Sequence, residues 1–221
     1  MPSQLFCTDV DLLRWEPNVL REAAFASQTL IAGTGDLSGT TFTISSGSLT
    51  DADVSPDHVI VLGGDVNGCF PVVSVESETT LNLSVLYDGL DEENPVPHAP
   101  GLTVPTTSIP FVIRTFWAQR SIVSEILSSA AGAGLPRDGS ISATIVDPRS
   151  LRRVCVLGTL QMIYSALAAA APDEPHYAVR ADVYERLYRR ALRSASVAID
   201  LDGDGHADAH RMLSVVNFLR A

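Results

Sequence analysis

The sequence predicts an α+β protein, in which a helical bundle domain carries an inserted small antiparallel β-barrel or sandwich and a C-terminal β-hairpin around an Asp-rich loop. Apolar residues recur at helical spacing near both ends of the chain, whereas they alternate with polar residues in the middle. The formal net charge of the 221 residues is -11. Residues 23–113 contain eleven acidic residues and no Lys or Arg, so the whole net charge lies there. This composition step indicates a separately packed module.

The first residues predict two helices. Thr8, followed by acidic residues, is typical of a helix N-cap, so we expect a short helix over Asp9–Arg14. Apolar residues three and four positions apart predict a second helix over Asn18–Ile31. Gly33 and Gly35 are expected to end it.

Short strands are expected next. Alternating or continuous apolar runs bounded by Gly, Asp and Asn occur at residues 41–45, 59–62, 73–76 and 81–85. A proline-rich stretch, residues 91–110, predicts an extended connector that returns the chain to its first domain. The predicted domains are therefore 1–34 with 111–221, a helical body with the hairpin, and 35–110, an inserted acidic β domain with its Pro-rich return linker.

The remaining residues predict three helices, over 111–131, 148–171 and 176–196. Residues 154–171 are uncharged, but polar side chains interrupt them, so we expect a buried core helix and no membrane span. The last helix has an apolar stripe that is expected to face the core, made of Val179, Val183, Leu187, Ala191 and Ala195. Strands are expected at residues 141–146, 197–199 and 215–219, the last two pairing with each other.

The most distinctive motif is Asp-Leu-Asp-Gly-Asp-Gly-His-Ala-Asp, residues 200–208. Its carboxylates match positions 1, 3, 5 and 9 of the EF-hand calcium loop, with Gly at position 6. Arg211 stands where the EF-hand has its bidentate Glu, and the preceding Val-Ala-Ile is strand-like, so the motif is closer to calcium loops between strands. We expect a structural Ca²⁺, with an Asp/Gly turn that holds no metal as the alternative. The expected ligand residues are Asp200, Asp202, Asp204, His206 (through its carbonyl) and Asp208.

Enzymatic motifs are missing from the sequence. All 15 basic residues are Arg, which removes every lysine-dependent site such as the P-loop. Neither GxSxG nor HExxH occurs, and Cys7, Cys69 and Cys155 have no metal-site spacing, so we expect reduced, mostly buried thiols. No catalytic or cofactor-binding residue is assigned, and the protein is expected not to be an enzyme. A hydrolase with a dispersed active site is the remaining enzymatic alternative.

Three stretches resemble the head-to-tail adaptor (connector) proteins in the neck of tailed bacteriophages and prophages. They are TDVDLLRWEP at residues 8–17, IRTFWAQ at 113–119, and YERLYRRAL at 184–192, which runs into the Asp-rich loop and VVNFL at 215–219. They lie on both sides of the β insertion, which is the part least matched.

The resemblance implies a virion protein, made in the host cytoplasm, that forms a ring, of twelve copies in the family. The ring would join the portal protein to a stopper or tail protein, with DNA passing through its lumen without sequence-specific binding and no membrane involved. An acidic lumen would repel phosphate, so residues 23–113 are placed there as a hypothesis, with an outward-facing insertion as the equal alternative. The alternative is a calcium-dependent binding or adhesion module; the chain starts without a basic, apolar export signal, which speaks against it.

Overall fold

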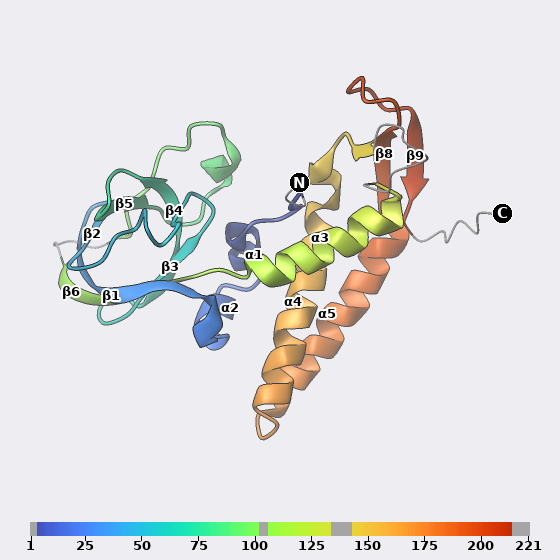
Figure 1. The fold of residues 1–221 in the computed structure, drawn as a ribbon. Helices are drawn as coiled ribbons and strands as arrows, with labels where there is room; N and C mark the ends of the chain where they lie inside the picture. Colours follow the sequence, from blue (N-terminus) through green and yellow to red (C-terminus); the bar gives the residue numbers. More distant parts are fainter. Residues whose placement is uncertain (1–3, 102–105, 134–142, 214–221) are drawn as a thin grey trace. The chain divides into compact units, whose positions relative to one another are not determined.

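A computed structural model describes residues 4–101, 106–133 and 143–213 (Figure 1). The fold is α+β with a small closed antiparallel barrel, as predicted. The chain divides into two compact units, a barrel unit formed by Thr8–Phe116 and a helical unit formed by Met1–Cys7 together with Trp117–Ala221. The chain therefore leaves the helical unit after residue 7 and returns to it at residue 117.

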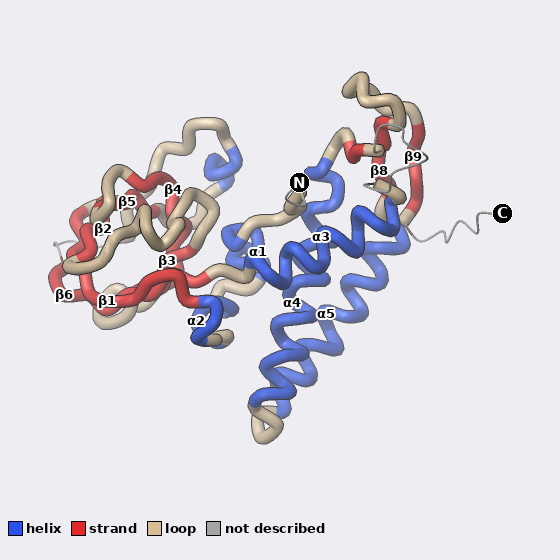
Figure 2. The backbone as a smooth tube through the Cα atoms, in the orientation of Figure 1, coloured by secondary structure: helices blue, strands red, loops and turns tan. Residues whose placement is uncertain are grey.

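Six strands form the barrel in the order β1-β2-β5-β4-β3-β6 (Figure 2). They are β1 (Thr29–Ser38), β2 (Thr41–Ile44), β3 (Val59–Leu62), β4 (Gly68–Val75), β5 (Thr80–Leu83) and β6 (Thr106–Arg114). Neighbouring strands are antiparallel, and β6 closes the barrel by pairing with β1 on one side and β3 on the other. Closure leaves the barrel without an unpaired edge.

The first strand corrects the predicted helix over Asn18–Ile31. The helix α2 covers only Val19–Glu22, a 3-10 turn follows at Ala26–Gln28, and β1 begins at Thr29. Pairing with β6 outweighs the local helical spacing, because it places Ile31 opposite the buried Ile113.

Glycine in β1 serves packing and ends no helix. A Cβ on Gly35 would lie 2.6 Å from the Phe42 ring, so only glycine admits that ring. The predicted domain boundaries at 34/35 and 110/111 fall inside β1 and β6, and the inserted unit is larger than residues 35–110. The end of the predicted proline-rich connector is part of β6, where the Pro110 carbonyl still accepts a hydrogen bond from the Gly63 amide at 2.8 Å.

The barrel interior is apolar, and Phe42 and Phe111 meet there edge to face with ring centroids 5.3 Å apart. Ile60 and Leu62 of β3 belong to this core. The alternate residues Val59 and Val61 are buried as well. Strand alternation turns these two outward, where α1 (Asp9–Trp15) and α2 contact β3. The two short helices thus cover the outside of the barrel at this strand.

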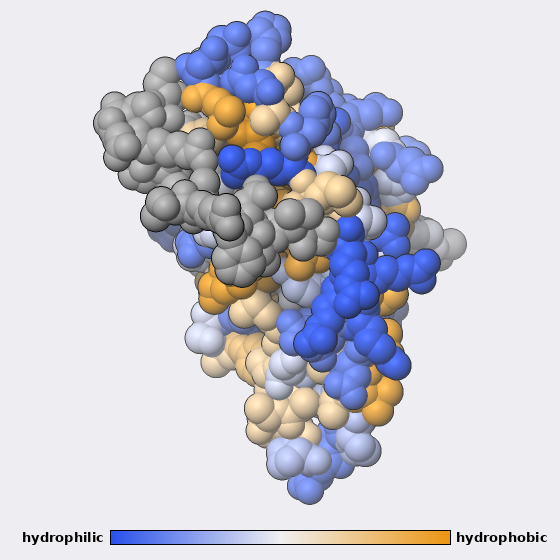
Figure 3. Space-filling view, turned by 90° about the vertical axis from the view of Figure 1, so that its right-hand side faces the viewer, coloured by the Kyte–Doolittle hydropathy of each residue, from blue (hydrophilic) through white to orange (hydrophobic). Residues whose placement is uncertain are grey.

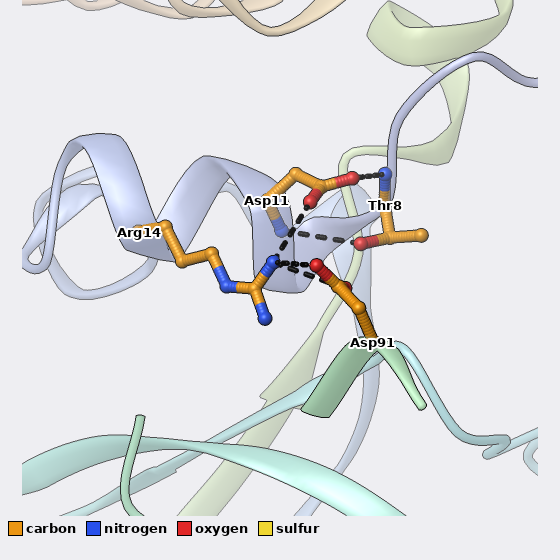
Figure 4. Close-up of polar contacts among 4 residues, drawn as sticks. All are labelled: Thr8, Asp11, Arg14 and Asp91. Carbon is orange, nitrogen blue, oxygen red and sulfur yellow. Dashed lines mark hydrogen bonds and ion pairs between the residues drawn. The ribbon is translucent and has the colours of Figure 1, made fainter. Parts of the chain in front are cut away.

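Helix α1 begins with the predicted N-cap. The Thr8 hydroxyl accepts a hydrogen bond from the Asp11 amide, and the Asp11 carboxylate accepts one from the Thr8 amide, which makes a capping box (Figure 4). Arg14 donates to both carboxylate oxygens of Asp91 at 3.0 and 2.9 Å, so α1 also holds the segment after β5 (Figure 4).

Asp9 joins the beginning and the end of the barrel unit. Its buried carboxylate accepts hydrogen bonds from the Thr115 hydroxyl at 2.7 Å and from the Phe116 amide at 3.0 Å. Arg114 adds a second link by donating to the Leu20 carbonyl at 2.9 Å. The residues that enter the unit and those that leave it are therefore held together by charge-assisted hydrogen bonds.

The helical unit contains α3 (Trp117–Ala131), α4 (Arg152–Ala170) and α5 (Pro175–Ser194), and α4 packs against both others. Gly158 permits their close approach, since a Cβ there would lie 2.9 Å from both Val123 of α3 and Tyr188 of α5. Residues Pro148–Ala170 are long and apolar enough to cross a membrane, with mean hydropathy 1.4 over an 18-residue window. Of that window, 56% is buried inside the protein, as in a core helix.

The prediction that the apolar stripe of α5 faces the core is wrong for two of its residues. Val179 is 60% exposed and Val183 is 38% exposed. Tyr184 is buried in their place and stacks on Tyr164 of α4, with ring centroids 5.6 Å apart. Aromatic side chains bury more area than valine, so the tyrosines determine which face of α5 meets α4.

A small antiparallel sheet completes the helical unit, in the order β7 (Thr144–Ile145), β8 (Ser196–Asp200), β9 (Ala209–Met212). Of the strand predicted over residues 141–146, the structure describes only this short β7. The predicted strand 215–219 lies outside the described residues, and β8 forms its hairpin with β9.

We expect Asp9→Ala to lower the free energy of unfolding by about 1–3 kcal/mol, because the buried Phe116 amide loses the carboxylate that accepts its hydrogen bond. Urea denaturation measures the change. The exposed Asp65→Ala is the control and should stay within about 0.5 kcal/mol of wild type. Equal effects of the two substitutions would contradict the role given to Asp9.

Candidate metal site in the Asp-rich loop

The Asp-rich loop joins β8 to β9, and the two strands fix its ends. Val197 and Ile199 anchor β8 with buried side chains, while Asp200 pairs with Thr144 of β7. The Asp208 amide donates to the Ile199 carbonyl at 2.9 Å, which closes the loop at its base.

The Asp200 carboxylate organises the loop from within. It accepts hydrogen bonds from the backbone amides of Asp202, Gly203 and Gly205 at 3.1, 2.6 and 2.8 Å. Gly203 and Gly205 have φ values of 84° and 85°, a left-handed conformation that favours glycine. The carboxylate and the two glycines together bend the chain around one centre.

The same contacts shift the titration of Asp200. Hydrogen bonds from the Gly203 amide first, and then from Gly205, hold the pKa of this carboxyl below its ordinary value. The folded loop therefore favours the ionised form of Asp200, which is the form that binds cations.

Three carboxylates converge in this loop. Oxygen atoms of Asp200, Asp202 and Asp208 lie within 4.8 Å of one another, so the group could hold a metal ion. Asp200 is buried and the other two are exposed. A set made only of carboxylate oxygens suits a hard cation such as Ca²⁺, Mg²⁺ or Mn²⁺. Ionised carboxylates this close repel one another, and a cation would relieve that repulsion.

The structure brings together three of the five predicted ligand residues. Asp204 and His206 lie in the loop outside the group, with the Asp204 carboxylate accepting a hydrogen bond from the His206 amide at 2.7 Å. Their part in metal binding, the His206 carbonyl included, stays a prediction.

Sequence spacing did not reveal a buried cysteine pair in the helical unit. The Sγ atoms of Cys7 and Cys155 are 2.8 Å apart, although 148 positions separate the residues. The hydrogen bond with Cys7 lowers the pKa of the Cys155 thiol. Both cysteines are buried, as predicted, and their contact attaches the N-terminal segment to α4. Arg120 supports the same attachment by donating to the Cys7 carbonyl at 3.1 Å.

Comparisons with protein-family models, with curated proteins and with solved structures find no match to this chain.

The lowered pKa of Asp200 predicts a specific response to acid. The pKa of Asp200 in the folded protein lies below the unfolded value of about 3.9. The ionised carboxylate therefore stabilises the loop at pH values above about 4. This stabilisation is lost as the pH falls through the folded-state pKa. NMR signals of the Gly203 and Gly205 amides should shift with a midpoint below that of an ordinary Asp. In Asp200→Asn this titration should disappear. A midpoint at or above the ordinary value would contradict the hydrogen-bonded carboxylate.

Proposed function

We propose that this chain is a structural virion protein, a head-to-tail adaptor whose copies form a ring between the portal and the next neck or tail component. The observation that carries the proposal is the chain's organisation. A single helical unit is built from Met1–Cys7 and Trp117–Ala221, and a complete barrel is inserted between them. The entropic cost of closing an insertion grows only slowly with its length, so one chain can supply two separately packed units with which to contact several neighbours.

Two of the stretches that carry the resemblance lie where the chain passes from one unit to the other. The third lies in the last long helix. Residues 8–17 contain α1, and residues 113–119 contain the end of β6 and the start of α3. Residues 184–192 lie in α5, which leads into β8 and the Asp-rich loop. The resemblance therefore concerns α1, the passage from β6 into α3, and α5, and it leaves the strands β1 to β5 unmatched.

Charge supports the proposed DNA channel. Residues 23–113 carry eleven acidic side chains and no basic ones, and these residues lie within the barrel unit. If this unit faces the lumen, its field repels the phosphate backbone, so DNA passes without being held. The proposal assigns no enzymatic activity and places the protein in the virion neck after synthesis in the host cytoplasm.

We further propose that the Asp-rich loop binds a structural Ca²⁺. Asp200, Asp202 and Asp208 supply converging carboxylates, and Asp204 and the His206 carbonyl are the remaining ligands expected from the loop pattern. The ion would fix the tip of the β8–β9 hairpin.

The same loop favours the second candidate function, a calcium-dependent binding or adhesion module. Such a module would use the ion to order a ligand-binding surface and would stay monomeric. Assembly therefore distinguishes the two functions.

Purified protein should assemble into a closed ring, of twelve copies by the family resemblance, and should bind portal rings. Light scattering coupled to gel filtration measures the mass, and electron microscopy shows the ring and the side on which the barrel lies. A protein that stays monomeric at high concentration, with or without portal, contradicts the adaptor proposal. Calcium-dependent binding to a carbohydrate or protein array by that monomer would support the module.

Calcium should bind to the wild-type chain and raise its melting temperature in proportion to the logarithm of its concentration. The double substitution Asp202→Asn/Asp208→Asn should weaken binding at least about tenfold, because two of three converging charges are lost. Calorimetric titration measures the affinity. The exposed Asp173→Asn, on the same helical unit, is the control. Equal binding by the wild-type and doubly substituted proteins would contradict this site.

A further inference from the structure

A groove lies between the start of α4 and the C-terminal half of α5, with a volume of about 570 Å³. Its apolar lining includes Val154, Leu187 and Ala191, and its polar lining includes Ser150, Arg153 and Arg190. Figure 3 shows a strongly hydrophilic stripe beside apolar surface on the helical unit. The groove therefore combines apolar side chains with guanidinium groups.

The groove is lined by two basic side chains, Arg153 and Arg190, and by no acidic one among its eight lining residues, in a protein that is acidic overall. Guanidinium groups favour carboxylates, which they bind with paired hydrogen bonds. The expected occupant is a peptide segment that offers carboxylates together with apolar side chains.

The barrel unit of this chain presents such a segment, which we call the acidic segment, residues 86–96. Leu86 is 39% exposed and Val96 is 69% exposed. Between them lie four exposed acidic side chains, Asp88, Asp91, Glu92 and Glu93. Asp91 is bound by Arg14 of α1, so the segment is partly ordered before any partner binds, which lowers the entropic cost of docking.

We propose that the acidic segment of one copy docks into the α4–α5 groove of the next copy. The inference rests on the proposed function, because it names the contact that would build the ring. Charge complementarity supports it, since an acidic, apolar segment and a basic, apolar groove occur on the same chain. A contact between two different surfaces is heterologous, and repeated around an axis it closes into a ring.

Two variants test the contact, one on each side. Arg190→Glu blocks the groove, and Glu92→Arg/Glu93→Arg reverses the charge of the acidic segment. Each variant alone should remain monomeric, with an association constant at least about tenfold below wild type. A mixture of the two should assemble again, because one contact of each pair joins the wild-type charges and the other joins the exchanged charges. Sedimentation velocity measures all three samples, and circular dichroism confirms folding.

Arg193→Glu is the matched control, since Arg193 is an exposed arginine on α5 that does not line the groove. It should assemble as wild type does. If wild type forms rings and all variants do so equally, the docking contact is wrong and the adaptor proposal survives. If wild type stays monomeric and the mixture does not assemble, both proposals are overturned.

Discussion

Closure of the barrel by β6 is the constraint on which the rest of the structure depends. Because β6 pairs with β1, Thr29 at the start of the barrel lies opposite Arg114 at its end. The chain therefore enters and leaves at neighbouring points, and the buried Asp9 carboxylate reinforces this by binding the Phe116 amide. Residues on both sides of the insertion can then belong to one helical unit. An open sheet would leave an unpaired edge and would impose no such meeting of the two ends.

Local patterns predicted the elements whose stability is local. The Thr8 N-cap follows from side-chain contacts within one turn, and the bend of the Asp-rich loop follows from Asp and Gly preferences within nine residues. Alternation in the middle of the chain similarly predicted a small antiparallel barrel or sandwich, and the structure has the barrel. The first strand was missed because its sequence, TLIAGTGDLS, satisfies helical spacing at its start and becomes a strand only through pairing with β6.

Contacts between distant residues had no signal in a single sequence. The sequence pattern indicates only that Asp9 lies in the first turn of a helix. In the structure its buried carboxylate accepts hydrogen bonds from Thr115 and Phe116, more than a hundred positions away. Cys7 and Cys155 similarly meet only after folding. For the candidate site, the sequence predicted the Asp-rich loop, but only the structure showed that Asp200, Asp202 and Asp208 converge. A ligand set depends on side-chain directions, which spacing alone does not determine.

Acidic residues are concentrated in the barrel unit, and arginines in the helices α4 and α5. This division of charge supports both the adaptor proposal and the proposed docking contact. It depends on the barrel being a closed insertion. Cross-strand nuclear Overhauser effects in the full-length protein test this closure most directly. We expect contacts between backbone protons of residues 29–37 and 106–114, including Gly33 with Phe111. Continuous helical contacts through residues 18–31, with none to residues 106–114, would contradict the account.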